Sequence, residues 1–176
     1  MKIDNFYPLY EKKLIPFIGK SLKFLEIGVQ DGSSIKKWRK MSPSWNVHGV
    51  DIDPECEAEN IFIGDQLDKK FMEKFHNFDI IIDDGGHTWK QQIETFEHLF
   101  PTMRKGGLYI IEDLHTSFWK TFDDYEISCV DYFLKKVPHL NYKVANDAGR
   151  LLGEPLKDLG IKAIEFYPSI IFIWKD

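Results

Sequence analysis

Two apolar stretches that end in acidic residues constrain the fold of this 176-residue chain most strongly. Residues 80–87 read IIIDDGGH, and residues 108–115 read LYIIEDLH. Continuous apolar stretches are typical of strands buried on both faces, as in parallel sheets. If the two strands are neighbours, Asp84, Glu112 and Asp113 meet at the carboxyl edge of the sheet, where open α/β sheets bind ligands. Clustered carboxylates repel one another unless a cation or a proton intervenes, so this pattern predicts a hard divalent metal ion.

Composition narrows the class of protein. The chain length fits a single domain over residues 1–176, and a content of 43% hydrophobic and 15% aromatic residues excludes a disordered chain. A net charge of −5 argues against non-specific binding to nucleic acid or to an anionic membrane. Residues 1–5 lack an apolar signal core, so we expect a cytoplasmic protein. Cys56 and Cys129 are isolated and show no metal-binding spacing, which predicts an incidental or structural role.

The order of predicted elements indicates an α/β fold with a Rossmann-like, doubly wound, mostly parallel sheet. Two final strands, at 161–167 and 170–174, are separated by only two residues and should therefore form an antiparallel hairpin. A polar stretch containing Asn146, Asp147, Gly149 and Gly153 precedes them. The other strands are expected at 22–27, 47–52, 60–63, 78–83 and from 108, and helices at 6–17, around 35–38, 71–75, 89–103 and 125–137.

Polar residues before the predicted helices are candidate N-caps. We expect Ser33 or Ser34 to cap the helix that carries Ile35 and Trp38, Asp83 or Asp84 to cap the helix that begins near Trp89, and Asp123 or Asp124 to cap the next one.

The turn after the first predicted strand favours a ligand without phosphate. Residues 24–33 read FLEIGVQDGS. A dinucleotide-binding turn needs glycine at the position of Gln30, where the backbone approaches a pyrophosphate, so NAD is disfavoured. Gly28 and Gly32 with the acidic Glu26 suit a ligand that carries an ammonium and a sulfonium group, such as S-adenosylmethionine.

Further acidic residues extend this candidate site. Asp51 ends a strand about 20 residues after Gly28, the spacing at which Rossmann-like folds hold a ribose diol. Asp65 and Gln66 could meet an adenine, although a helix cap is an open alternative for Asp65. The full set of candidate cofactor residues is Glu26, Gly28, Gly32, Ser33, Asp51, Asp65, Gln66 and Asp83.

Over residues 22–119 the chain resembles class I S-adenosylmethionine-dependent methyltransferases. Within that class, residues 82–87 and 105–119 are similar to the macrocin and mycinamicin sugar O-methyltransferases, which act on deoxysugar hydroxyls of macrolides and depend on magnesium. The chain departs from them in lacking their N-terminal region and in having Gly86 where serine is usual. The resemblance implies that Asp84, Glu112 and Asp113 bind Mg²⁺ or Mn²⁺ and that His87 is the general base.

We therefore expect a metal-dependent O-methyltransferase that acts on a sugar hydroxyl of a glycan or glycosylated metabolite. His87 follows Asp84 by three residues, about one helical turn, so both side chains can face one crevice. His115, Phe118 and Trp119 either line the acceptor site or serve packing, and both interpretations stay open. The expected partners are a small-molecule or glycan acceptor and further copies of the chain, without nucleic acid or membrane.

Two other functions remain open. One is a hydroxylase-like pathway enzyme, similar in its core to cephalosporin hydroxylase components. The other is a non-catalytic cofactor-binding subunit, against which the retention of all four expected site residues argues.

Overall fold

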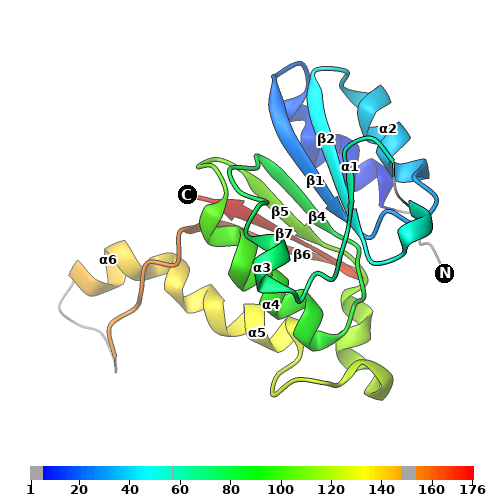
Figure 1. Cartoon of the computed structure of the whole chain (residues 1–176). Coiled ribbons are helices and arrows are strands. Elements are labelled where there is room, and N and C mark those ends of the chain that lie inside the picture. Colours follow the sequence, from blue (N-terminus) through cyan, green and yellow to red (C-terminus); the bar gives the residue numbers. More distant parts are fainter. Residues whose placement is uncertain (1–5, 57, 148–153) are drawn as a thin grey trace.

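The sheet runs through the whole molecule, with helices on both of its faces (Figure 1). The computed structural model describes residues 6–56, 58–147 and 154–176, so the predicted polar positions Gly149 and Gly153 lie outside the described residues. The seven described strands follow the order β3-β2-β1-β4-β5-β7-β6. They are β1 (Leu22–Ile27), β2 (Trp45–Asp51), β3 (Ile61–Ile63), β4 (Ile80–Asp83), β5 (Leu108–Ile111), β6 (Ile161–Tyr167) and β7 (Ile170–Lys175).

Strand directions confirm the predicted topology. The first five strands pair in parallel, whereas β7 runs antiparallel to both β5 and β6. Only Pro168 and Ser169 separate β6 from β7, too short a link for a crossover connection. The fold is therefore the expected mostly parallel sheet with a C-terminal antiparallel hairpin.

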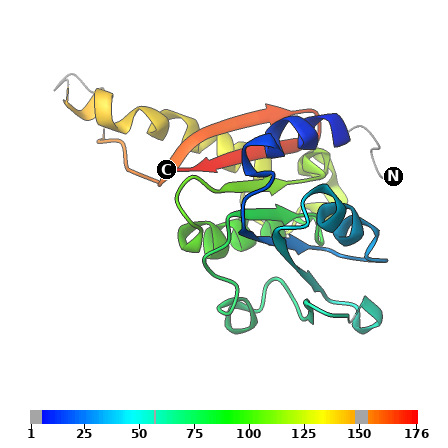
Figure 2. The same ribbon diagram turned by 90° about the horizontal axis from the view of Figure 1, so that it is seen from above.

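The helices divide between the two faces of the sheet. Side chains of α1 (Tyr7–Leu14) and α2 (Ser33–Met41) belong to one buried cluster, and those of α4 (Trp89–Leu99) and α5 (Cys129–Lys136) belong to the other. Figure 2 shows α1 beside the C-terminal hairpin. The remaining helices are α3 (Lys69–Met72) and α6 (Tyr142–Asp147), with 3₁₀ turns at Ile15–Phe17, Pro54–Cys56, Phe100–Thr102, Leu114–Phe118, Lys120–Phe122 and Val137–Asn141. No helix in the described part of the chain combines the length and the apolar character needed to span a bilayer.

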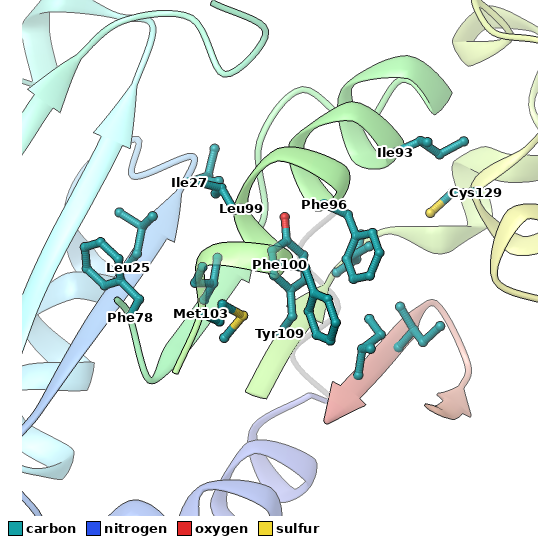
Figure 3. Close-up of a cluster of buried hydrophobic side chains, with 14 of the residues drawn as sticks. Leu25, Ile27, Phe78, Ile93, Phe96, Leu99, Phe100, Met103, Tyr109 and Cys129 are labelled. Carbon is teal, nitrogen blue, oxygen red and sulfur yellow. The ribbon is translucent and has the colours of Figure 1, made fainter. Parts of the chain in front are cut away.

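The apolar residues that recur along α4 and the turn after it belong to one core cluster. Ile93, Phe96 and Phe100 are buried, and the Phe96 ring lies edge-on to Tyr109 of β5 at 5.2 Å (Figure 3). Trp89, at the start of the helix, is only half-buried. The helical pattern therefore serves packing, and it seats α4 on the strands whose ends carry the acidic residues.

The predicted helix caps are wrong in three cases. Gly32, with φ of +70°, precedes α2, and no side chain caps this helix. Thr88 caps α4 in a capping box with Gln91, so neither Asp83 nor Asp84 does so. Ser128 caps α5, so neither Asp123 nor Asp124 does so. Ser33 and Ser34 are already inside α2, whereas the acidic residues predicted to cap α4 and α5 lie too far upstream of Thr88 and Ser128.

Candidate metal and cofactor site

Strand register aligns the ends of β1, β4 and β5. Asp83, the last residue of β4, pairs with Ile27 of β1 on one side and with Ile111 of β5 on the other. The next residues along, Gly28, Asp84 and Glu112, therefore emerge side by side at the carboxyl edge. A Cβ atom on Gly28 would lie 2.0 Å from the Asp84 carbonyl oxygen, so only glycine allows the two segments this close.

Three polar side chains converge just beyond these strand ends. Ligand atoms of Asp84, His87 and Asp113 all lie within 4.8 Å of one another. His87 Nε2 is 3.9 Å from Asp84 Oδ1 and 3.5 Å from Asp113 Oδ2. Each side chain is about one quarter exposed, at 23%, 26% and 25% for His87, Asp84 and Asp113. The structure thus brings together two expected metal ligands and the expected base.

His87 reaches this group by a route that differs from the predicted helical turn. Its φ is +60°, and α4 begins only at Trp89, so the segment from Asp84 to His87 is not helical. The Thr116 hydroxyl donates to the His87 carbonyl oxygen at 2.9 Å and fixes this backbone. Burial lowers the pKa of His87, Asp113 opposes this effect, and His115 adds to it. The imidazole is therefore biased toward its neutral, proton-accepting form.

Glu112, the third expected metal ligand, lies outside that group of three. Its carboxylate accepts a hydrogen bond from the hydroxyl of Tyr10 on α1. Its backbone is also fixed, since Gln92 Nε2 donates to its carbonyl oxygen at 3.0 Å and its own N–H donates to Asp83 at 3.0 Å. Glu112 therefore connects the edge of the sheet to the N-terminal helix.

A cavity of about 180 Å³ adjoins the acidic group on the β1–β3 side. Typical small-molecule sites enclose roughly 300–1,000 Å³, so a ligand as large as S-adenosylmethionine would extend beyond it or displace side chains around it. Asp84 lines this cavity and so joins it to the metal group. Its lining includes four of the candidate cofactor residues, Gly28, Asp51, Asp65 and Gln66, whereas Glu26, Gly32, Ser33 and Asp83 lie outside it.

Asp51 closes the turn that follows β1. Its Oδ2 accepts hydrogen bonds from the backbone N–H groups of Val29 and Gln30, each at 2.8 Å, and its Oδ1 accepts one from Asp53 at 2.9 Å. Partial burial works to raise the pKa of Asp51, but these bonds outweigh it and hold the pKa below its ordinary value. Asp51 is therefore an ionised acceptor at neutral pH, as ribose binding requires.

Three other cofactor candidates stabilise the turn between β1 and α2. Glu26 is only 1% exposed and accepts a hydrogen bond from the Ser34 hydroxyl at 2.8 Å. Gly32 precedes α2 with a left-handed conformation, and Ser33 donates its N–H to Asp31. These residues fix the path from β1 into α2.

Gln66 and Asp83 form a buried polar network beneath the cavity. Gln66 Nε2 donates to Thr95 at 3.0 Å and to Asp83 at 3.3 Å, while its Oε1 accepts from the Gly86 N–H at 2.9 Å. The amide of Gln66 is therefore engaged in holding the loop that leads to His87. Burial raises the pKa of Asp83 to about 7, outweighing its hydrogen bonds. Asp65, by contrast, is exposed and accepts from the Leu67 N–H at 2.8 Å, while Asp68 caps α3.

Aromatic residues lie near the group of Asp84, His87 and Asp113, outside the lining of the cavity. The His115 ring hydrogen-bonds Ser169 of the hairpin at 2.5 Å and lies edge-on to Trp119 at 4.5 Å. Trp119 is 51% exposed and Phe118 is 75% exposed. An exposed aromatic surface beside a polar centre is typical of a binding site.

A larger hollow of about 720 Å³ lies elsewhere, between α1 and α2, and contains none of the predicted site residues.

Two features of the site are not predicted from the sequence. Ile52, 69% exposed, lines the cavity, and an apolar residue directly after Asp51 was the available signal. Four non-glycine residues near the site, Gln30, His87, Asp113 and Ser169, have φ between +49° and +63°. Such conformations cost about 1–3 kcal/mol each and are concentrated at functional sites, but no sequence pattern predicts them.

Comparison with solved structures identifies the fold. The methyltransferase MycE of the mycinamycin biosynthetic pathway, in complex with Mg, SAH and mycinamycin VI, is similar over 97% of this chain and 48% of its own length, with 28% identity and a TM-score of 0.81. An O-methyltransferase from Bacillus cereus in complex with SAH, at 15% identity and a TM-score of 0.52, shares the fold alone. The chain has the fold of the class I S-adenosylmethionine-dependent methyltransferases.

Sequence comparison names the relatives within that class. The chain is 30% identical, over 98% of its length and 50% of the relative's, to the 8-demethyl-8-alpha-L-rhamnosyl tetracenomycin-C 2'-O-methyltransferase of Streptomyces olivaceus. It is 33% identical, over 66% of its length and 33% of the relative's, to the mycinamicin VI 2''-O-methyltransferase of Micromonospora griseorubida. No protein-family model matches the chain. Its relatives are thus sugar O-methyltransferases, which confirms the predicted resemblance, and the chain spans half or less of their length.

Proposed function

We propose that this chain is the catalytic unit of a metal-dependent O-methyltransferase that transfers the methyl group of S-adenosylmethionine to a sugar hydroxyl of a glycan or glycosylated metabolite. The convergence of Asp84, His87 and Asp113 beside the cavity that Asp51 lines carries this proposal. The relatives at 30% and 33% identity, both named as sugar O-methyltransferases, support it.

The donor atoms at the site fit a hard cation. Asp84 and Asp113 present carboxylate oxygens close together, and Glu112 directly precedes Asp113 at the end of β5. Oxygen donors are those that Mg²⁺ and Mn²⁺ prefer. MycE, whose structure contains Mg, has the same fold. We therefore assign Mg²⁺ or Mn²⁺ to Asp84 and Asp113, with Glu112 as the third ligand.

His87 is the base in this proposal. When bound, the cation would lower the pKa of an acceptor hydroxyl, and S-adenosylmethionine would supply the methyl group. His87 Nε2, biased toward the neutral form and set between two carboxylates, takes the proton of that hydroxyl. Asp113 then stabilises the imidazolium from 3.5 Å. Trp119 and Phe118 provide an apolar surface for the sugar ring.

A thermal-shift experiment tests the proposed function on the purified chain. S-adenosylmethionine and its demethylated product should raise the melting temperature, because a ligand that binds only the folded state stabilises it. NAD should not, because Gln30 occupies the position at which a dinucleotide site needs glycine. A shift with NAD and none with S-adenosylmethionine would contradict the assignment.

Replacing Asp51 should weaken cofactor binding, because its carboxylate both lines the cavity and holds the turn after β1. Asp51→Ala removes a charged acceptor from the cavity, which should cost about 1–3 kcal/mol of binding free energy. Isothermal titration calorimetry with S-adenosylmethionine measures this loss. Asp53→Ala is the matched control, since Asp53 is the next acidic residue and does not line the cavity. Equal affinities for wild type and Asp51→Ala would remove Asp51 from the cofactor site.

We also propose that copies of the chain associate. A single domain rich in aromatic residues, with exposed apolar side chains such as Ile15 (64% exposed) and Ile18 (47%) on one face, favours self-association. Multi-angle light scattering should report a mass above that of one chain. A monomer at high protein concentration would contradict this proposal.

A further inference from the structure

A hydroxyl group from the first helix reaches the metal edge of the sheet. Tyr10 lies on α1, and its hydroxyl donates to Glu112 Oε1 across 102 residues of sequence. Tyr10 is only 3% exposed. This contact lies at the one expected metal ligand that stands apart from the group of Asp84, His87 and Asp113.

The ring of Tyr10 is held in place from two sides. It lies edge-on to Trp38 of α2, with ring centroids 5.1 Å apart, and to Phe172 of β7, with centroids 6.2 Å apart. Edge-to-face pairs at these separations are favourable arrangements for aromatic rings. The hydroxyl is therefore presented to Glu112 by a rigid support.

The Tyr10 hydroxyl is the donor in this contact, and an oxygen of the Glu112 carboxylate accepts. A neutral donor next to a carboxylate fixes the orientation of that carboxylate without cancelling its charge.

The hydroxyl is not the only polar attachment of α1. Lys13, one turn further along the helix, forms an ion pair with Glu165 of β6 and lies over the Phe172 ring at 5.8 Å from its centroid. Glu165 is held in turn by Trp174 Nε1 at 2.7 Å. The Lys13–Glu165 ion pair already anchors α1 to the hairpin. Anchoring of the helix therefore does not by itself explain why the Tyr10 hydroxyl lies at Glu112.

We propose that Tyr10 is a positioning residue for the metal site, orienting the Glu112 carboxylate for a divalent cation shared with Asp84 and Asp113. This inference rests on the proposed function, and it deepens it by making α1 part of the metal site. A partner that orients a ligand typically contributes 10–100-fold to metal affinity.

Metal binding tests the inference directly. Tyr10→Phe keeps the ring and removes the hydroxyl, so the dissociation constant for Mn²⁺, measured by electron paramagnetic resonance on the full chain, should rise about 10–100-fold. Tyr167→Phe is the matched control. It removes a partly buried hydroxyl that donates to Glu165 at 3.3 Å, in the contact between α1 and the hairpin but away from the end of β5. The control should bind Mn²⁺ as wild type does.

A double-mutant cycle separates positioning from general stabilisation. In a Glu112→Gln background, Tyr10→Phe should have no further effect on Mn²⁺ affinity, because its partner ligand is already lost. Independent, additive effects would overturn the inference, as would unchanged affinity in Tyr10→Phe. If Tyr10→Phe does not fold, Glu112→Asp carries the test, since the shorter side chain keeps its charge but loses its reach to Tyr10. Wild-type affinity in Glu112→Asp would then overturn the inference. Failure of the wild-type chain to bind Mn²⁺ would instead contradict the proposed function.

Discussion

Removal of divalent metal is expected to abolish methyl transfer while leaving S-adenosylmethionine bound. The metal is assigned to the acceptor side, on Asp84 and Asp113, whereas Asp51 and the turn after β1 are assigned to the cofactor. Excess EDTA should therefore eliminate turnover, and calorimetry in the same buffer should still show cofactor binding. Added Mg²⁺ or Mn²⁺ should restore activity.

Variants of the carboxylates make this expectation specific to the site. Asp113→Asn keeps the shape of the side chain and removes its charge, so it should weaken the binding of Mg²⁺ and require a higher metal concentration for activity. Glu73→Gln serves as the control, because Glu73 is an exposed residue after α3, away from the strand ends. Full activity of the wild type in EDTA would exclude the metal from the mechanism.

His87→Ala should lower turnover about 10²–10⁴-fold, the usual contribution of a general base. Cofactor and metal should still bind, because Asp51, Asp84 and Asp113 remain. His76→Ala is the control, since His76 is an exposed histidine at the opposite end of β4. Normal turnover in His87→Ala would show that His87 is not the general base and has only a structural role before α4.

The pH dependence gives a second measure of the same residue. His87 must be neutral to accept a proton, and burial lowers its pKa below the ordinary value of 6.5. The wild-type rate should therefore rise with pH through a value below 6.5 and then level off, since the base is lost as pH falls through its pKa. A pH–rate profile of His87→Ala should lack this acidic limb.

Local patterns predicted the fold and the two central carboxylates. The boundaries of β1 and β6 agree with the predicted strands, because a buried strand bounded by turn residues is encoded within a few positions. The convergence of Asp84 and Asp113 follows from adjacency of β4 and β5, which the topology of a doubly wound sheet implies.

The remainder of the site depends on contacts between distant residues. The partner of Glu112 lies 102 residues away on α1, and a helical apolar pattern alone gives no sign that Tyr10 also carries a polar contact. The left-handed conformation of His87 arises because Thr116 and Gln66 hold the loop on both sides. His87 lies near Asp84, as the sequence predicts, but through a left-handed turn and not through the predicted helical turn.

The sheet order has a consequence for how the site is assembled during folding. β5, whose end carries Glu112 and Asp113, pairs with β7 along residues 108–111. β1 pairs with β4, so that Phe24 lies beside Ile80, 56 positions further along the chain. Such distant pairings incur a loop-closure entropy cost and slow folding. Until the hairpin has been synthesised, β5 leaves an unpaired edge, which is prone to association with other chains. The nascent chain thus exposes an aggregation-prone strand edge, although Tyr10, Asp84 and His87, the partners of the acidic residues at its end, have already been synthesised.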